Sequence, residues 1–487
     1  MEYESVIGLE VHVQLQTKSK LFCGCLVNFG AAPNSQTCPV CLGLPGVLPV
    51  FNRQAFEWGI RVALALDATV GRVMKFDRKQ YFYPDLPKNY QISQYDQPLA
   101  RRGALTIDGE GNSKRIGIHR IHLEEDAGKL LHSTDEPVSF VDFNRAGVPL
   151  LEIVSEPDLR STEEAYQYLV ELKAVLQYLE VSNCNMEEGS LRCDTNVSLR
   201  RPTDISLGAK VEIKNLNSFR AVKQALEHEI KRQALLLDQG SAIALETRLW
   251  DAKRQRTESM RSKEDAADYR YFPEPDLVPF VIDSNVVEQI QAALPELPAQ
   301  RRQRFQSVYQ LSAYDAHVLT QERTLAELFE RTACLCQKPK AVANWIMGDL
   351  LAYLNAKNLA LDAVTLRPEW LAQLIGLVDD GTLSGTMAKE VWGKVLERGI
   401  EPAVIVREGS LQQIVDVGLL EHLADSVIRE YPKSVEDYSK GKANALMYLV
   451  GQGMKRSQGK ANPQQMTQLL KRKLDELRER ITGRVTE

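Results

Sequence analysis

The chain lacks the features that would place it in a membrane or an export pathway. No uninterrupted apolar run approaches the ~20 residues that a membrane helix needs. The first residues, "MEYESVIGLEVHV", are acidic and strand-like, which is typical neither of a secretory signal nor of an Arg-rich transit peptide. These absences predict a cytoplasmic protein.

The motifs of the commonest nucleotide and acyl-transfer sites are missing as well. There is no G-x-x-x-x-G-K-[ST] loop and no G-x-G-x-x-G, so neither a P-loop NTPase nor a dinucleotide fold is indicated. There is also no G-x-S-x-G nucleophile elbow. If the protein uses a nucleotide, a metal ion and basic residues on a sheet must hold the phosphates.

What is present predicts an α+β protein. The chain of 487 residues is long enough for about three domains of ~150 residues each. Strand-like alternation in "YESVIGLEVHVQL", "SLRCDTNVSLR" and "AKVEIKNLNS", with a helix predicted after Ser161, indicates a domain with a mainly antiparallel sheet over residues 1–293. Prolines at 294–300 predict a linker. Helical periodicity then predicts two all-α domains, a helical domain over 294–408 and a basic tail domain over 409–487.

Four of the eight cysteines form two short chelates twelve residues apart, a Cys-x-Cys and a Cys-Pro-Val-Cys. They are Cys23, Cys25, Cys38 and Cys41. Because disulfides are rare in a reducing cytosol, four thiolates in this pattern predict a tetrahedral zinc site. No coordination position is left open for water, which favours a structural role; the alternative is four buried thiols that pack as small hydrophobes. We expect Cys334 and Cys336 to belong to the core.

Acids and a histidine recur at two-residue spacing on the predicted strands. Residues two apart share a face of a strand. We therefore expect the two side chains of each of these pairs to point to the same face: Glu10 with His12, Asp194 with Asn196, and Glu212 with Lys214. Hard oxygen ligands from several strands suit Mg²⁺, which binds substrate phosphates. The predicted ligands are Glu10, His12, Glu124, Glu125, Glu152, Asp194 and Glu212. The alternative is ordinary surface charge on an antiparallel sheet.

The stretch "RIHLEED" contains two of these acids side by side. If its strand is regular, Glu125 shares the apolar side with Ile121 and Leu123, whereas Glu124 points to the opposite side. A carboxylate on an apolar side must be paired or bind a cation. Asp126 is expected to be the solvated end of the run.

Residues 77–98, "DRKQYFYPDLPKNYQISQYDQP", interleave aromatic and basic residues. Such a mixture can stack unpaired bases and contact phosphates, although local packing is the commoner reason for an aromatic loop. The prolines and the irregular pattern predict a structured loop.

The tail contains a second basic stretch. From Tyr438 to Lys473 there is no Asp or Glu, within a chain whose formal net charge is −5. The basic residues are Lys440, Lys442, Lys455, Arg456, Lys460, Lys471, Arg472 and Lys473. This asymmetry favours contact with a phosphate backbone over a solvated helical face, which usually mixes both signs.

Together, these stretches resemble the B subunits of the aspartyl/glutamyl-tRNA(Asn/Gln) amidotransferases over essentially the whole chain. The segments that carry the resemblance are "GLEVHVQL", "CPVCLGLPGVLPV", "YFYPDLPKNYQISQ", "HLEEDAGK", "VDFNRAGVPLLEIVSEPD", "MEEGSLRCDTNVS", "VEIKNLNSF", "DYRYFPEPDL" and "GKANP".

The resemblance implies a heterotrimer with an amidase A subunit and a small C subunit. The A subunit releases ammonia from glutamine, and the B subunit recognises tRNA misacylated with Glu or Asp. With ATP and Mg²⁺ it phosphorylates the side-chain carboxylate, and channelled ammonia then gives Gln-tRNA(Gln) or Asn-tRNA(Asn). The implied fold is a glutamine-synthetase-like cradle followed by the helical domain and a tail that contacts the tRNA elbow.

The resemblance also implies roles for single residues. Glu125 would face the ammonia route, with Lys79 and Lys88 as its gate. Weaker candidates for nucleotide or phosphate contacts are Arg192, Lys214, Arg261 and Lys263, and for the tRNA 3′ end Tyr81, Tyr83 and Tyr90.

Two rival hypotheses are a free-standing ATP-dependent carboxylate–amine ligase for a small molecule and a zinc-containing RNA-binding protein without catalysis.

The four-thiol pattern yields the first testable prediction. Metal analysis of the purified chain is expected to find about one zinc per chain, because four thiolates fill a tetrahedral site. Cys38→Ser should lower that content, whereas Cys334→Ser should leave it unchanged. A wild-type chain purified without zinc, or one that keeps it in Cys38→Ser, would contradict the assignment.

Overall fold

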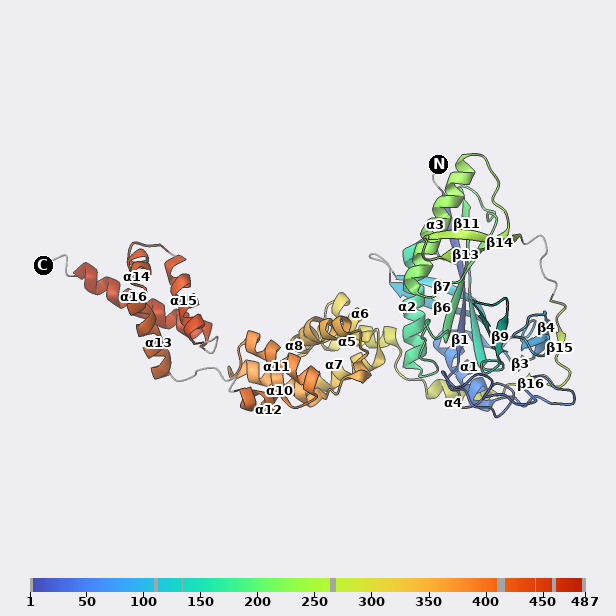
Figure 1. Ribbon diagram of the computed structural model, residues 1–487, viewed down its shortest axis with the longest axis horizontal. Helices are drawn as coiled ribbons and strands as arrows, with labels where there is room; N and C mark the ends of the chain where they lie inside the picture. Colours follow the sequence, from blue (N-terminus) through green and yellow to red (C-terminus); the bar gives the residue numbers. More distant parts are fainter. Residues whose placement is uncertain are drawn as a thin grey trace. The chain divides into compact units, whose positions relative to one another are not determined.

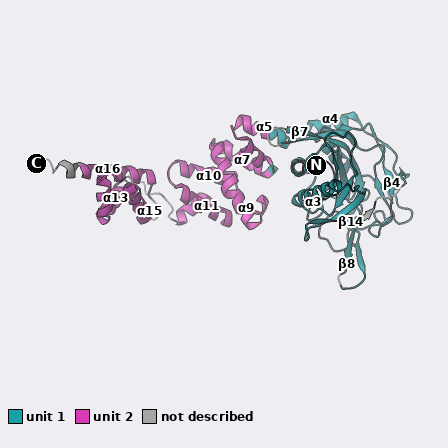
Figure 2. Cartoon of the chain, turned by 90° about the horizontal axis from the view of Figure 1, so that it is seen from above, with its two compact units in different colours: residues 1–301, 321–323 teal, residues 302–320, 324–487 magenta. Residues whose placement is uncertain are grey.

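The computed structural model describes residues 3–108, 113–133, 135–262, 269–409, 417–442, 444–457 and 461–483. Packing divides the chain into two compact units (Figure 2), Met1–Arg301 with Gln321–Arg323, and Arg302–Thr320 with Thr324–Glu487. The first unit contains the sheet, and the second is helical. This division does not test the predicted boundaries at residues 293 and 408, which stay predictions.

A nine-stranded sheet forms the centre of the first unit (Figure 1), in the order β14-β13-β12-β11-β1-β10-β7-β6-β2. The strands are β1 (Glu4–Gln14), β2 (Thr69–Val70), β6 (Ala100–Asp108), β7 (Ser113–Glu125), β10 (Pro149–Ser155), β11 (Leu191–Arg200), β12 (Val211–Lys214), β13 (Glu246–Asp251) and β14 (Arg256–Ser262). All these neighbours pair antiparallel except β12 and β13, which are parallel. The predicted α+β class with a mainly antiparallel sheet is confirmed.

One face of this sheet is apolar and is covered by helices. Alternation along β1 buries Leu9, Val11 and Val13 in a core shared with α1 (Arg53–Ala65), α2 (Thr162–Tyr178) and α3 (Phe219–Asp238). The predicted cap of α2 is confirmed, since the Ser161 side chain accepts a hydrogen bond from the Glu164 backbone N–H. The intervening residues of β1 point to the other face, which is therefore available to polar groups.

A small sheet borders the end of β7. It has the order β15-β4-β5 and consists of β4 (Asp77–Gln80), β5 (Tyr90–Ser93) and β15 (Phe272–Pro273). The expectation of a structured loop over residues 77–98 is therefore wrong for both strands, which form a hairpin with prolines in its connection. Four-residue strands are too short for their alternation to stand out. Two further pairs are β3 (Val73–Met74) with β16 (Phe280–Val281) and β8 (Lys129–His132) with β9 (Ser139–Asp142).

The rest of the chain is helical. After α4 (Ser284–Ala292), the elements are α5 (Pro298–Val308), α6 (Ala313–Thr320), α7 (Arg323–Cys336), α8 (Pro339–Asn344), the π-helix η2 (Trp345–Leu350), α9 (Leu351–Lys357), the 3-10 helix η3 (Leu361–Ala363), α10 (Pro368–Asp379), α11 (Gly385–Arg398) and α12 (Pro402–Gly409). Then follow α13 (Val417–Glu430), α14 (Pro432–Ser439), α15 (Asn444–Arg456) and α16 (Pro463–Gly483), which share a hydrophobic core of their own. Among the helices that the structure describes, none has the length and apolar character needed to cross a membrane.

The expectation that Cys334 and Cys336 belong to the core is wrong. Cys334 is exposed and Cys336 is only partly buried, although both lie on α7. The buried side of that helix is formed by Leu325, Ala326, Leu328, Phe329, Thr332 and Ala333. At 3.6 residues per turn, position 334 lies off this side.

Exposure and pKa together predict which thiol reacts. At mildly alkaline pH, iodoacetamide should alkylate Cys334 quickly and leave Cys184 almost untouched in the native chain. Cys184 is buried, and burial raises its pKa to about 11, so little reactive thiolate forms. Peptide mass spectrometry over a time course measures both sites, and unfolded protein, in which both must react, is the control. Equal native rates would contradict this description.

Candidate functional site

Histidines and carboxylates from three neighbouring strands meet on the sheet face opposite the helices. His12 of β1 lies opposite Glu152 of β10, which in turn lies opposite His122 of β7. The His12 Nε2 atom is 3.4 Å from a Glu152 oxygen and 3.9 Å from a Glu124 oxygen. We call His12, His122, Glu124 and Glu152 the carboxylate–histidine cluster. One ligand atom each from His12, Glu124 and Glu152 lie within 4.8 Å of one another, a spacing that suits a metal ion.

His122 was not among the predicted site residues. Its Nε2 atom lies 3.1 Å from Glu152 and 3.5 Å from Glu124, and its side chain is 2% exposed. Its Nδ1 atom has no hydrogen-bond partner among the described residues. The rule that paired Glu10 with His12 would have identified it, because His122 precedes Glu124 by two residues on one strand.

The cluster holds its charges despite its burial. Burial by itself would raise the pKa of Glu152, but His122 and His12 hold it well below the usual 4.5. Burial likewise opposes the charge on His122, yet the Glu152 charge and Glu124 raise its pKa to about 9. The carboxylates of Glu124 and Glu152 are thus stabilised by positive charge on the neighbouring histidines. A bound divalent cation would stabilise the same two carboxylates.

The other predicted magnesium ligands of this face are bound elsewhere. Glu10 accepts a hydrogen bond from the Asn196 amide at 2.8 Å. The Lys214 ammonium lies 2.6 Å from Asp194 and 3.2 Å from Glu212. Among the described residues, these acids do not join the group around His12. Their role as ligands, and that of Lys214 toward phosphate, stay predictions.

A cavity of about 760 Å³ continues this face of the sheet. Its wall includes Gln14, Lys129, Arg145, Asn183, Arg192, Asp194 and Asn217. Arg192 lies opposite His12 in the register of β1 and β11, which places a guanidinium at the border between the cavity and the cluster. The predicted phosphate contact of Arg192 is compatible with this position but is not tested by it.

Asp126 is not the solvated end of the acidic run. Its side chain is buried and accepts hydrogen bonds from Arg192 at 2.9 Å and from Gln14 at 2.8 Å. Burial opposes its charge, but Arg192 and Arg145 lower its pKa. The run looked solvated because its partners come from distant segments. Asp126 anchors the Arg192 side chain at the cavity.

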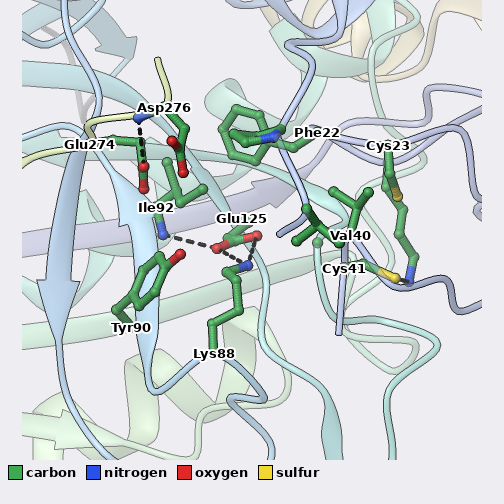
Figure 3. A pocket seen from close by; sticks show the side chains of 14 residues that line it. Phe22, Cys23, Val40, Cys41, Lys88, Tyr90, Ile92, Glu125, Glu274 and Asp276 are labelled. Atoms are coloured by element: carbon green, nitrogen blue, oxygen red, sulfur yellow. Dashed lines mark hydrogen bonds and ion pairs between the residues drawn. The ribbon is translucent and has the colours of Figure 1, made fainter. Parts of the chain in front are cut away.

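Glu125 points to the other side of the strand, as alternation predicted. It lines a small pocket with Lys88, Tyr90 and Ile92 (Figure 3). The Lys88 ammonium lies 2.5 Å from one Glu125 oxygen and donates to the other at 2.7 Å, and the Ile92 N–H donates at 2.9 Å. Both oxygens of this buried carboxylate are thus occupied by donors.

Lys79 does not lie in this pocket. Its ammonium faces the Tyr269 ring at 4.9 Å and the Tyr81 ring at 5.9 Å from their centroids. Burial by itself would lower the Lys79 pKa, but Glu124 and Glu152 raise it, so the side chain is a lasting cation. The structure therefore separates the two lysines that were predicted as one gate.

The other aromatic residues of the hairpin take different positions. Tyr83 is 58% exposed, and Tyr90 lies beneath the Arg78 guanidinium at 4.2 Å. Arg78 in turn forms a two-point contact with Glu274 at 2.7 and 2.8 Å. Contacts of Tyr81, Tyr83 and Tyr90 with the tRNA 3′ end remain predictions.

Two of the four predicted zinc ligands, Cys23 and Cys41, line the pocket across from Glu125 (Figure 3). The Sγ atoms of Cys23, Cys25, Cys38 and Cys41 all lie within 4.8 Å of one another. A hydrogen bond with Cys23, helped by the Cys38 N–H and Lys20, lowers the pKa of Cys41 to about 4. An all-thiol set that already favours a thiolate fits a zinc ion. The buried Lys20, with Nζ 3.5 Å from the Cys41 sulfur, carried no signal in the sequence.

Two groups of predicted basic residues remain. The Arg261 side chain and all of Lys263 and Lys460 lie outside the described residues. In the tail, Lys440 contacts Glu436, Lys442 contacts Asp437 and Arg456 contacts Glu430. These acids precede the basic stretch, so part of its charge is balanced locally. A tRNA contact by this stretch, Lys455 included, stays a prediction.

The cluster predicts where a divalent cation binds. Glu152→Gln should weaken Mn²⁺ binding by at least about 10-fold. Losses of this size follow even when a group that only supports a metal ligand is removed. Electron paramagnetic resonance of Mn²⁺ measures the affinity. Glu156→Gln is the matched control, since Glu156 is half-exposed and pairs with His119 at the surface. Equal Mn²⁺ affinity in wild type and Glu152→Gln would exclude Glu152 as a ligand.

Comparison with known proteins identifies the family of the chain. Residues 5–288 match the GatB/GatE catalytic domain family, and residues 327–474 match the GatB domain family. The B subunit of the aspartyl/glutamyl-tRNA(Asn/Gln) amidotransferase of Carboxydothermus hydrogenoformans is 56% identical over 98% of this chain and 100% of its own length. The corresponding proteins of Caldanaerobacter subterraneus and a Synechococcus strain are 55% and 51% identical over 97% and 98% of this chain, and 100% and 98% of their own lengths. The chain therefore belongs to the family of aspartyl/glutamyl-tRNA(Asn/Gln) amidotransferase B subunits.

Proposed function

We propose that this B subunit uses ATP and Mg²⁺ to phosphorylate the side-chain carboxylate of Glu-tRNA(Gln), Asp-tRNA(Asn) or both. It then transfers ammonia to the activated carboxyl group to give Gln-tRNA(Gln) or Asn-tRNA(Asn). The ammonia comes from glutamine hydrolysed by an amidase A subunit, in a cytoplasmic heterotrimer with a small C subunit. The observation that carries the proposal is the carboxylate–histidine cluster beside the large cavity.

The residues of the cluster suit magnesium in this reaction. His12, Glu124 and Glu152 offer one nitrogen and several carboxylate oxygens within 4.8 Å. Bound Mg²⁺ supplies positive charge that lets a carboxylate approach the anionic γ-phosphate. Arg192, held by Asp126 at 2.9 Å, adds a fixed cation at the border of the cavity.

The reaction then needs no nucleophile from the chain. An oxygen of the substrate carboxylate forms a bond to the γ-phosphorus while the bond to ADP breaks, which leaves an acyl phosphate. Ammonia attacks the carbonyl carbon, the carbon–nitrogen bond forms and inorganic phosphate leaves. The absence of Ser or Cys nucleophile motifs agrees with a proposal in which the A subunit, and not this chain, hydrolyses glutamine.

Glu125 and Lys88 suit the ammonia side of the reaction. Glu125 is buried in a pocket on the other side of β7 from the cluster. A carboxylate there can take the proton that ammonium loses when it becomes the nucleophilic ammonia. Because Lys88 occupies both Glu125 oxygens, it must move before the proton can transfer. The four cysteines, with a bound zinc, would fix the opposite pocket wall.

The amidation assay tests the proposal. The complex with its A and C partners is expected to convert Glu-tRNA(Gln), Asp-tRNA(Asn) or both in the presence of ATP and glutamine. Glu125→Gln should lower this rate by about 100-fold or more, since an amide cannot accept the proton. Glu163→Gln on the exposed side of α2 is the control.

Each outcome of this assay separates two hypotheses. A wild-type rate in Glu125→Gln would contradict the role of Glu125 alone. Amidation of free glutamate as readily as Glu-tRNA(Gln) would favour the alternative function, a free-standing ATP-dependent ligase for small molecules. If the complete complex released no phosphate from ATP with either misacylated tRNA, the proposed function would be wrong.

A further inference from the structure

The β4–β5 hairpin has two sides that serve two different carboxylates. In its register, Asp77 lies opposite Ser93 and Lys79 lies opposite Gln91, so these four residues share one side. On this side the Ser93 hydroxyl donates to Glu124 at 2.9 Å. Lys79 therefore projects from the side of the hairpin that meets the carboxylate–histidine cluster.

The opposite side of the hairpin belongs to the pocket. Tyr90 and Ile92 line it, and the Ile92 N–H binds Glu125. Lys88, two residues before Tyr90, reaches into the same pocket and pairs with Glu125 (Figure 3). Lys79 therefore lies on the side of the hairpin that meets Glu124 through Ser93, and Lys88 lies in the pocket with Glu125.

An aromatic enclosure fixes the Lys79 ammonium. Its rings are Tyr81 and Tyr269, which meet edge to face at 6.3 Å. Tyr271 contacts the second of these rings, Tyr269, at 6.1 Å. The Gln80 N–H donates to the Tyr269 carbonyl at 2.9 Å, which holds this segment against β4. Ring faces attract a cation without neutralising it.

The ammonium of Lys79 also differs from that of Lys88 in its partners. Within the described part of the chain, no carboxylate lies at ion-pair distance from Lys79, whereas Lys88 is fully engaged by Glu125. A cation that faces aromatic rings, with no carboxylate of the described residues at ion-pair distance, is suited to bind an anion that arrives with the substrate.

We propose that Lys79 is a catalytic residue of phosphoryl transfer that binds the transferred phosphoryl group, and that Tyr81 and Tyr269 are its positioning residues. Lys79 then acts as a hydrogen-bond donor and fixed charge: the carboxylate–phosphorus bond forms, the bond to ADP breaks, and no proton leaves Lys79. Its site is the cluster side of the hairpin and not the ammonia route. This inference rests on the proposed function.

The test compares the two half-reactions in the complete three-subunit complex. Phosphate release from ATP is measured with Glu-tRNA(Gln) and no amide donor, and amidation is measured with glutamine and with ammonium chloride. Lys79→Met is expected to lower all three rates by a similar factor of ~100, the usual loss when one donor to a transition-state charge is removed. Lys79→Arg, which keeps the charge, should recover most of the phosphate release.

Matched variants separate this role from a structural one. Lys88→Met should give the signature of the ammonia side, a larger loss with glutamine than with ammonium chloride. Lys223→Met, on α3 at the other face of the sheet, should match wild type. Tyr269→Phe should keep the enclosure and the rates, whereas Tyr269→Leu should lower kcat with little change in KM for the tRNA.

The opposite results would overturn the inference. A Lys79→Met complex that loses only glutamine-dependent amidation would place Lys79 on the ammonia route, and one with wild-type rates in all assays would leave it without a role. If the Lys79→Met variant does not assemble into the three-subunit complex, the Lys79→Arg and Tyr269→Leu variants test the inference instead. Unchanged phosphate release in Tyr269→Leu would contradict the positioning role of the aromatic rings. A wild-type complex without tRNA-dependent phosphate release would instead reject the proposed function.

Discussion

Two adjacent carboxylates, Glu124 and Glu125, are buried at the end of one strand, and each needs its own compensation. Both side chains are about 3% exposed, and alternation directs them to opposite sides of β7. A buried carboxylate without donors or a cation is strongly unfavourable. The β4–β5 hairpin serves both acids, because Ser93 binds Glu124 while Lys88 and the Ile92 N–H bind Glu125. The position of the hairpin and the charges of both sites therefore depend on one another.

If the proposed function is right, this arrangement gives a physical reason for keeping phosphoryl transfer and ammonia delivery apart. A free ammonium ion would be attracted by the acids of the cluster, whereas a neutral ammonia molecule is the nucleophile that the reaction needs. Glu125 and Glu124 lie on opposite sides of the strand, so the proposed proton acceptor is a neighbour of the cluster but is not part of the described group around His12. The magnesium-ligand role predicted for Glu125 stays a prediction. A buried charge is compensated at the pocket wall as well. There Lys20 places a positive charge beside the thiolate of Cys41.

Local pattern predicted the directions of side chains well and their partners poorly. The opposite directions of Glu124 and Glu125 follow from a two-residue period, and the structure confirms them. The same period identifies His122, although the apolar neighbours of His122 hid it. Asp126 and Cys334 were misjudged for a common reason. Exposure depends on what packs against a residue, and neither Arg192 nor the neighbours of α7 can be located from nearby sequence.

The sequence by itself determined the family, the α+β class, the four-thiol set and the side of the strand to which each acid points, because these depend on identity and on short-range spacing. Only the tertiary structure decided which predicted ligands meet. The antiparallel register of β1, β10 and β7 sets His12 beside Glu152 and His122, while the same face carries Glu10, Asp194 and Glu212 to other partners. The hairpin likewise places Lys79 beside the rings of Tyr81 and Tyr269 and Lys88 in the pocket with Glu125. Such choices are made by strand register and by the pairing of buried charges, which act between segments that are distant in the chain.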